Sequence, residues 1–337
     1  MRLAATEAFF APPELRRLAE TVFRALATVR FARRTSLLAV FGPEGLTPDL
    51  VDGWVQAGLV HEARVLPVAL ASETVPYLAL TSAGARALTM ATGVLASGLS
   101  AARMKRSSQK RAHDLAVGEF GLTVTALARA QEIDLLGVQF DDKRLATSIV
   151  LRVPGQGPKR VALQADGYVL VRGPRGPVGL LVEVDRGTTS PLRLAEKYHG
   201  YLAWKTEGGP ERDFAVRAMR VVTLVPDERR LEKLHAAALI ANLDKRSGFL
   251  LFACDADVRP TECLRLLAPI ARSLGGDDAM RVPLFPSCSG AKVPQAAAPS
   301  GGSPLGCLEA SQCLPGGLSL PHARPPAVAA PPRVPML

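Results

Sequence analysis

The first ninety residues carry apolar positions spaced as in short helices, followed by two strand-like segments. Leucine and valine recur at helical intervals from Pro13 to Val29. Thr47 is placed to cap a helix that begins at Pro48 and ends near Gly58. The predicted helical segments cover residues 13–29, 35–41 and 48–58, the two strands cover 59–70 and 74–81, and a last helix begins at 81.

This order of helices and strands is that of a winged helix-turn-helix. The stretch Pro76–Leu88, with its Leu-Thr strand end and small-residue helix start, resembles the wing strand and following helix of bacterial winged-helix regulators. In such folds the third helix enters the major groove of DNA. Here that helix carries Asp49 and Asp52 and no Lys or Arg. A module for protein contact or dimerisation is therefore the alternative to DNA binding.

A second set of segments begins near residue 110 and alternates helices with apolar strands. The helices cover residues 110–132, 191–204 and 227–244, and the strands cover 135–140, 165–171, 178–185, 218–225 and 248–254. Ser190 is placed to cap the helix that begins at Pro191. The order helix, two or three strands, helix, strand is similar to the core of the restriction-endonuclease-like fold.

Together these patterns predict an α+β protein with four parts. The parts are a winged helix-turn-helix domain over residues 1–92, a basic linker over 93–111, a restriction-endonuclease-like α/β domain over 112–285 and a tail over 286–337. The tail is rich in Pro, Ala, Gly and Ser and has few charges. Because it cannot bury enough apolar surface to order itself, we expect it to be disordered.

Three carboxylates gather where the two central strands of the second domain meet. Glu183 and Asp185 end one strand and share a face, and Asp166 begins the strand before it. If the turn is Gly173–Gly176, Asp166 lies opposite Glu183; a five-residue turn would place it opposite Val184, on the other face. Burying three acids is costly without a positive partner. The two interpretations are a metal-binding cluster and solvated strand ends.

In restriction-endonuclease-like proteins, such acids bind magnesium and an acidic-x-Lys triplet supplies a lysine that positions the attacking water. The resemblance implies that Asp166 and Glu183 are catalytic ligands of Mg²⁺, and Asp185 is a further candidate catalytic residue and metal ligand. Asp185 stands where the lysine is expected, which is a departure from the pattern. Lys197, in the following helix, is the candidate to replace it. Arg186 offers an interpretation without metal, because its guanidinium could neutralise Glu183 or Asp185.

The chain is basic, with a formal net charge of +10 and a pI near 9.7. This charge favours a polyanionic partner, and we expect that partner to be DNA. The candidate DNA-binding residues are Arg30, Arg33, Arg34 and Arg64 of the first domain and Arg103, Lys105, Arg106, Lys110 and Arg111 of the linker. The alternative is a solvated basic surface and a solvated linker.

Composition argues against several other classes. No apolar run is long enough to span a bilayer, and Met1–Phe10 lacks the layout of a signal peptide. The five cysteines form no CxxC pair, which argues against a zinc module, and their odd number argues against a disulfide framework. We expect a cytoplasmic protein with no membrane partner, and protein partners and a homodimer stay open.

The remaining aromatic and histidine side chains have structural interpretations. Tyr198, Tyr201 and Trp204 have helical spacing and are expected to pack against the sheet, with stacking on a base as the alternative. His113, a lone histidine near a helix start, is expected to be a surface or core residue and not a ligand.

Three motifs of the second half resemble the bacterial replication-relaxation family. They are Asp166–Val171, Glu183–Thr188 with its Glu-x-Asp-x-Gly-Thr pattern, and Leu194–Tyr201, with Ala165 in place of the family's usual proline. The resemblance covers about residues 13 to 255. It implies a DNA-associated role in plasmid replication or mobilisation.

We therefore expect a DNA-binding protein of a plasmid or mobile element, involved in its replication, relaxation or mobilisation, with a nuclease-like domain. The missing triplet lysine favours a non-catalytic or regulatory role for that domain. The alternative is a Mg²⁺-dependent DNA endonuclease or nickase that uses Asp166 and Glu183.

Overall fold

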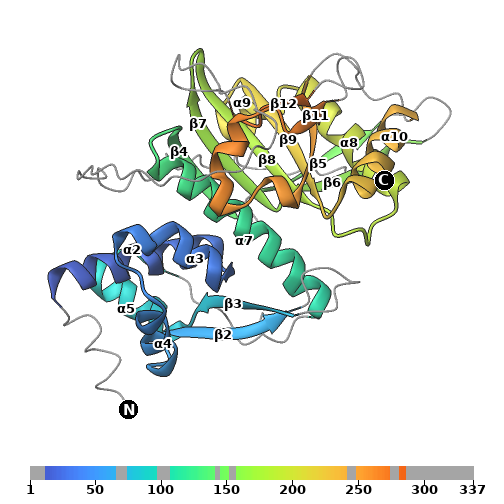
Figure 1. Ribbon diagram of the computed structural model, residues 1–337. Helices are drawn as coiled ribbons and strands as arrows, with labels where there is room; N and C mark the ends of the chain where they lie inside the picture. The colour runs from blue at the N-terminus through green and yellow to red at the C-terminus, as the bar shows by residue number, and fades with distance from the viewer. Residues whose placement is uncertain are drawn as a thin grey trace, which may run out of the picture. The chain divides into compact units, whose positions relative to one another are not determined.

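The computed structural model (Figure 1) describes residues 12–65, 74–96, 107–140, 145–151, 157–240, 248–273 and 281–285. The expected tail and its three cysteines lie outside the described residues. So do Arg103, Lys105 and Arg106 of the expected linker. None of the helices in the described ranges is long and apolar enough to cross a bilayer.

The N-terminal elements follow the predicted order of helices and strands, with one short strand added. They are α2 (Pro13–Val29), β1 (Ala32–Arg33), α3 (Arg34–Phe41), the 3-10 helix η1 (Gly42–Glu44), α4 (Pro48–Gln56), β2 (Val60–Val65), β3 (Val75–Leu80) and α5 (Ser82–Thr92). The strands form an antiparallel sheet in the order β1-β3-β2. Thr47 and Thr81 cap α4 and α5, each by accepting a hydrogen bond from a backbone N–H of the first turn.

Helix α7 (Ser108–Arg129) packs against elements that precede it and elements that follow it. Its Phe120 and Leu127 share one core with Phe23 of α2 and with strands of the large sheet. A methyl group at Gly118 would overlap the carbonyl oxygen of Phe31, so the close approach of α7 to the residue before β1 requires glycine.

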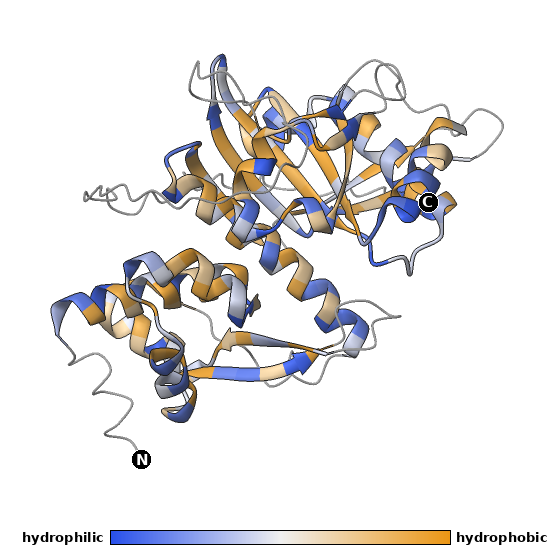
Figure 2. Cartoon of the chain, viewed as in Figure 1, coloured by the Kyte–Doolittle hydropathy of each residue, from blue (hydrophilic) through white to orange (hydrophobic). Residues whose placement is uncertain are grey.

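A seven-stranded sheet follows, in the order β12-β11-β10-β9-β8-β7-β4. Its strands are β4 (Asp134–Phe140), β7 (Gly167–Gly173), β8 (Gly176–Val184), β9 (Ala218–Val225), β10 (Leu250–Cys254), β11 (Ala271–Ser273) and β12 (Arg281–Val282). The three strands β8, β9 and β10 are parallel, and the other neighbours are antiparallel. Both faces are apolar, as the colouring of the strands in Figure 2 shows, so both must be covered.

Two layers of helices cover these faces. Helices α8 (Pro191–Thr206) and α10 (Glu228–Ile240) pack on the face that carries Leu181, while α7 and the 3-10 helix η4 (Pro260–Leu267) pack on the face that carries Val182. Because side chains alternate along β8, Glu183 lies on the same face as Leu181, beneath α8. The short α9 (Gly209–Phe214) and η3 (Asp255–Asp257) complete the described helices.

A separate two-stranded hairpin, which the sequence analysis did not predict, is inserted between β4 and β7. Its strands β5 (Ala146–Leu151) and β6 (Lys159–Gln164) pair with each other and not with the large sheet. The hairpin packs on α8, where Gly200 leaves room for Ile149, Val161 and Leu163. It therefore forms a wall above α8.

The structure confirms the predicted α+β class, and it also settles the register of the acidic hairpin. Arg172 pairs with Pro177 and Gly173 with Gly176, which is the shorter of the two turns considered. Gly176 has a φ of 113°, a conformation that favours glycine. The same register, continued by one residue beyond the Gly167–Val182 pair, places Asp166 opposite Glu183.

Candidate functional site

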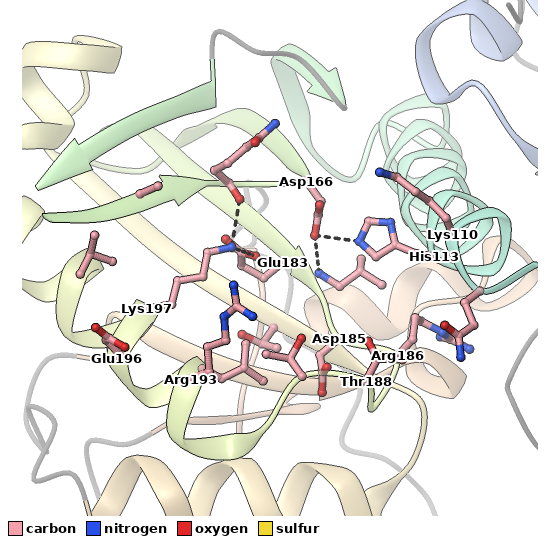
Figure 3. A pocket seen from close by; sticks show the side chains of 18 of the residues that line it. Lys110, His113, Asp166, Glu183, Asp185, Arg186, Thr188, Arg193, Glu196 and Lys197 are labelled. Atoms are coloured by element: carbon pink, nitrogen blue, oxygen red, sulfur yellow. Dashed lines mark hydrogen bonds and ion pairs between the residues drawn. The ribbon is translucent and has the colours of Figure 1, made fainter. Parts of the chain in front are cut away.

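The three predicted acids line one cavity of about 960 Å³, seen from close by in Figure 3. Its walls come from the start of α7, from β6, from the adjoining ends of β7 and β8, and from the first turns of α8. The sheet supplies the acids, and the helices and the inserted hairpin supply most of the basic residues.

Asp166 is fixed by main-chain hydrogen bonds at the start of β7. Its N–H donates to the carbonyl oxygen of Val182 at 2.8 Å, and its Oδ2 accepts from the N–H of Val184 at 2.9 Å. These two bonds extend the hairpin beyond its last ladder pair. The Asp166 side chain keeps 26% of its surface exposed, so it faces the cavity.

Glu183 is buried near the end of β8 and is held by two residues of α8. Lys197 Nζ donates to its Oε2 at 2.5 Å, and the Tyr201 hydroxyl donates to its Oε1. Lys197 also donates to the carbonyl oxygen of Gln164 on β6 at 3.0 Å. Burial raises the pKa of Glu183 to about 7, Asp166 adds to this effect, and the Lys197 ammonium and the Tyr201 hydroxyl oppose it.

His113 of α7 lies between two carboxylates. Its Nε2 is 3.2 Å from Oδ2 of Asp166, and its Nδ1 is 3.5 Å from Oδ1 of Asp114 (Figure 3 shows the first contact). Burial alone would lower the pKa of His113, but the hydrogen bonds and charges of the two aspartates raise it to about 10. At neutral pH this imidazole is therefore a cation beside Asp166.

Asp185 is also buried, but its cation comes from a distant helix. Arg230 of α10 donates through Nε to Oδ2 of Asp185 at 2.5 Å, and a second nitrogen donates to the carbonyl oxygen of Thr189. The sequence analysis offered Arg186 for this task. The structure instead pairs Arg186 with Asp255, a partly buried acid whose pKa is raised by desolvation, with the Arg186 guanidinium opposing that rise.

The predicted reach of Lys197 toward the acids is confirmed, but three other contacts were not predicted. His113 was expected to be a surface or core residue, Tyr201 to pack against the sheet or to stack on a base, and Arg230 was not considered. The i to i+4 spacing of Lys197 and Tyr201 was a usable signal, because it places both side chains on one helix face. His113 and Arg230 lie far from the hairpin in sequence, and only the tertiary packing of α7 and α10 brings them to it.

The predicted DNA-binding residues of the N-terminal domain already have protein partners. Arg34 pairs with Asp52 of α4 at 2.7 Å and with Glu62. The Arg33 side chain approaches Glu119 of α7, and Arg64 donates to Thr74. The other described candidates lie near α7 or at the end of α2: Lys110 lines the cavity, Arg111 interacts with the Tyr77 hydroxyl and Arg30 ends α2.

A metal ion that entered this cavity would meet the carboxylates of Asp166 and Glu183. No group of three or more His, Cys, Asp or Glu side chains suited to hold a metal ion occurs among the residues that the structure describes. Mg²⁺ is commonly bound by one or two carboxylates together with waters and substrate phosphates. Asp166 and Glu183 are therefore the two residues that would hold magnesium, and Asp185 is turned toward Arg230.

A comparison with protein families matches residues 54–214 to the model described as replication-relaxation. Over this segment, which is just under half of the chain, the protein is similar to the replication-relaxation family. The segment runs from α4 to the end of α9 and includes Asp166, Glu183 and Lys197. It leaves out Arg230, the partner of Asp185. Neither a search of curated proteins nor one of solved structures finds a match to the chain.

Proposed function

We propose that this chain is a replication-relaxation protein that binds the DNA of a mobile element, such as a plasmid, and acts on it during replication, relaxation or mobilisation. In this proposal the cavity around Asp166 and Glu183 receives the phosphodiester backbone. The N-terminal helices and the β2–β3 pair form a winged helix that adds DNA contacts. The similarity to this family supports the association with replication and relaxation of mobile elements.

The observation that carries this proposal is the contact between Lys197 and Glu183. Two acids on neighbouring strands face one cavity, and an ammonium group lies 2.5 Å from the second acid. A lysine at this point can bind a phosphate oxygen or hold a water molecule next to the acids. The lysine missing from the triplet on β8 is thus supplied in space by α8.

The mixed sheet supports the same proposal. An antiparallel β4-β7-β8 meander followed by a helix and the parallel strand β9 is the order expected for a restriction-endonuclease-like core. The N-terminal module fits a winged helix in its element order, but α4 carries Asp49 and Asp52. We therefore assign its DNA contacts to the basic residues around the module and not to the face of α4.

Metal-dependent cleavage or nicking of DNA is the second candidate function, and the position of Lys197 favours it. Magnesium bound by Asp166 and Glu183 would polarise a phosphate and lower the pKa of a bound water. Lys197 would orient that water, and Tyr201 would hold the Glu183 carboxylate in place through its hydroxyl. This candidate requires Glu183 to be ionised, as it is above its raised pKa of about 7.

An electrophoretic shift of labelled DNA across a salt series tests the binding proposal. We expect the full chain to bind DNA with an affinity that falls steeply as salt rises, because phosphate contacts release counterions. Absence of binding at low salt, for single-stranded and double-stranded DNA alike, would overturn it.

Nicking of supercoiled plasmid with Mg²⁺ or Mn²⁺ tests the second candidate. We expect nicking by the wild type and its loss in Glu183→Gln, which keeps the shape of the side chain but removes its charge. Glu232→Gln, on the exposed surface of α10, is the matched control and should nick as the wild type does. If the wild type binds DNA but never nicks it, the binding proposal stands and the cleavage candidate fails.

A further inference from the structure

The cavity holds more basic than acidic residues, and the surplus is concentrated on three side chains. Each acid that lines it has a cationic partner: Asp114 and Asp166 with His113, Glu183 with Lys197, Asp185 with Arg230 and Glu196 with Lys159. Among the described residues, Lys110, Arg160 and Arg193 also line the cavity and have no carboxylate partner. Four cations thus hold these five acids, with His113 shared by two aspartates, and the charges of Lys110, Arg160 and Arg193 remain for a ligand.

Each of the three cations lies three or four residues before a residue that contacts the acids or Lys197, and each is on a different element. On α7, Lys110 lies one turn before His113; on α8, Arg193 lies one turn before Lys197. On β6, Arg160 shares the face of Gln164, whose carbonyl oxygen accepts from Lys197. His113 and Lys197 contact the acids directly and Gln164 contacts Lys197, whereas Lys110, Arg193 and Arg160 lie three or four residues before them.

The spacing of these cations fits a polymer of phosphates better than a single phosphate. Arg193 lies about 6 Å along the helix axis from Lys197. Arg160 lies about 13 Å along β6 from Gln164, which is roughly the rise of four nucleotides in one strand of a duplex. All three side chains are exposed and stand on different walls, so they do not converge on one small anion.

We propose that Lys110, Arg160 and Arg193 form a phosphate-backbone subsite that holds a polynucleotide across the acidic centre. The inferred role of the inserted β5–β6 hairpin is to carry Arg160 over α8 and so to form one side of this subsite. This inference rests on the proposed DNA binding and extends it by naming the residues that hold the flanking phosphates. Lys159 is excluded from the subsite because Glu196 already neutralises it.

The salt dependence of DNA affinity tests this subsite in the full-length protein. Each phosphate contact contributes about 0.9 to the slope of log affinity against log salt for duplex DNA and about 0.7 for single strands. We expect Lys110→Gln, Arg160→Gln and Arg193→Gln each to lower the slope by about that amount, and the triple variant to lower it by about 2 to 3.

Arg217→Gln is the matched control for these variants. Arg217 is exposed and directly precedes β9 at the end where Ala218 pairs with Val178, whereas Glu183 pairs with Thr223 near the other end of β8 and β9. The Arg217→Gln variant loses one positive charge outside the cavity. Its slope of log affinity against log salt should therefore equal that of the wild type. A triple variant with the slope of the wild type would overturn the subsite while leaving the proposed function intact. A wild type that binds no DNA would overturn both.

Competition with inorganic phosphate and with a mononucleotide separates a polymer site from a small-anion site. We expect millimolar concentrations of either competitor, at constant ionic strength, to leave DNA binding by the wild type nearly unchanged. Displacement of the DNA by the mononucleotide, with the displacement lost in the triple variant, would show a small-anion site instead. The circular dichroism spectrum of each variant should match that of the wild type, since the three side chains are exposed.

Discussion

The charge on His113 depends on the two aspartates that flank it, and stability should therefore depend on pH. The pKa of His113 is raised from 6.5 to about 10, so the folded state binds this proton more tightly than the unfolded state. The resulting stabilisation is fully present below pH 6.5 and is lost as pH rises toward 10. We expect the difference in unfolding free energy between wild type and His113→Gln to shrink over this range. Urea unfolding at several pH values measures it, and parallel profiles for the two proteins would contradict the charge assignment.

Tyr201 and Tyr198 lie on the same helix, but their hydroxyl groups bond to different partners. Tyr201 donates to the buried carboxylate of Glu183, whereas Tyr198 exchanges a hydrogen bond of 2.9 Å with the Thr223 hydroxyl. A hydrogen bond to a charged group contributes more than one between neutral groups. We expect Tyr201→Phe to lower the unfolding free energy by about 1.5–3 kcal/mol and Tyr198→Phe by about 1 kcal/mol. Denaturant unfolding at a pH above 7, where Glu183 is ionised, compares them, and equal losses would argue against a charged Glu183.

At the level of elements, the contact between α7 and the residue before β1 explains why a glycine stands in the middle of that helix. A side chain at Gly118 would meet the backbone of Phe31, whereas one at Gly53 of α4 would meet nothing within 4 Å. We expect Gly118→Ala to destabilise the protein by about 1–3 kcal/mol through overpacking. Gly53→Ala should stabilise it by up to about 1 kcal/mol through helix propensity. Thermal unfolding compares the two, and a midpoint that rises in both would show that α7 can shift away.

Elements with a clear local sequence pattern were predicted. An element whose position depends on tertiary contacts was missed. The strand over residues 218–225 and the start of α8 at Pro191 agree with the structure, because a continuous apolar run and a Ser-Pro cap mark them locally. The hairpin β5–β6 was missed. Its apolar face packs on α8, and its apolar alternation extends over only six residues in each strand.

The same distinction holds for the candidate site. Asp166, Glu183 and Lys197 were predicted to meet because strand register and helix spacing place them, and the structure brings these three together. Arg230 could not be assigned to Asp185, since nothing in the sequence fixes which side of the sheet α10 covers. The magnesium ligands, the DNA contacts of the N-terminal arginines and the domain boundaries stay predictions.

For the whole molecule, a partly buried glutamate, Glu119, joins the N-terminal elements to the helix that borders the cavity. Glu119 of α7 accepts hydrogen bonds from the Arg33 N–H at 2.8 Å and from the Ser36 hydroxyl at 2.6 Å. Burial raises the pKa of Glu119, and its bonds to Ser36 and Arg33 oppose that rise. On its other side, α7 donates from Thr123 to the carbonyl oxygen of Val258. The helix thus ties β1 and α3 to the segment after β10.

Removing Glu119 should make the N-terminal elements and the large sheet unfold less cooperatively. Glu119→Ala leaves the Arg33 N–H and the Ser36 hydroxyl without their acceptor and removes the charge that faces the Arg33 guanidinium, at a cost of about 1–3 kcal/mol. The two tryptophans report on the N-terminal elements and on the large sheet separately. Trp54 packs against Phe23 of α2, and Trp204 of α8 packs against α9 in the core beside the sheet.

Single-tryptophan variants made with Trp54→Phe or Trp204→Phe should show one shared urea midpoint in the otherwise wild-type chain. In Glu119→Ala we expect the Trp54 midpoint to fall below that of Trp204, because β1 and α3 lose their hydrogen bonds to α7. If both midpoints fall together, the apolar contacts of α7 alone couple the two regions and Glu119 contributes only to overall stability.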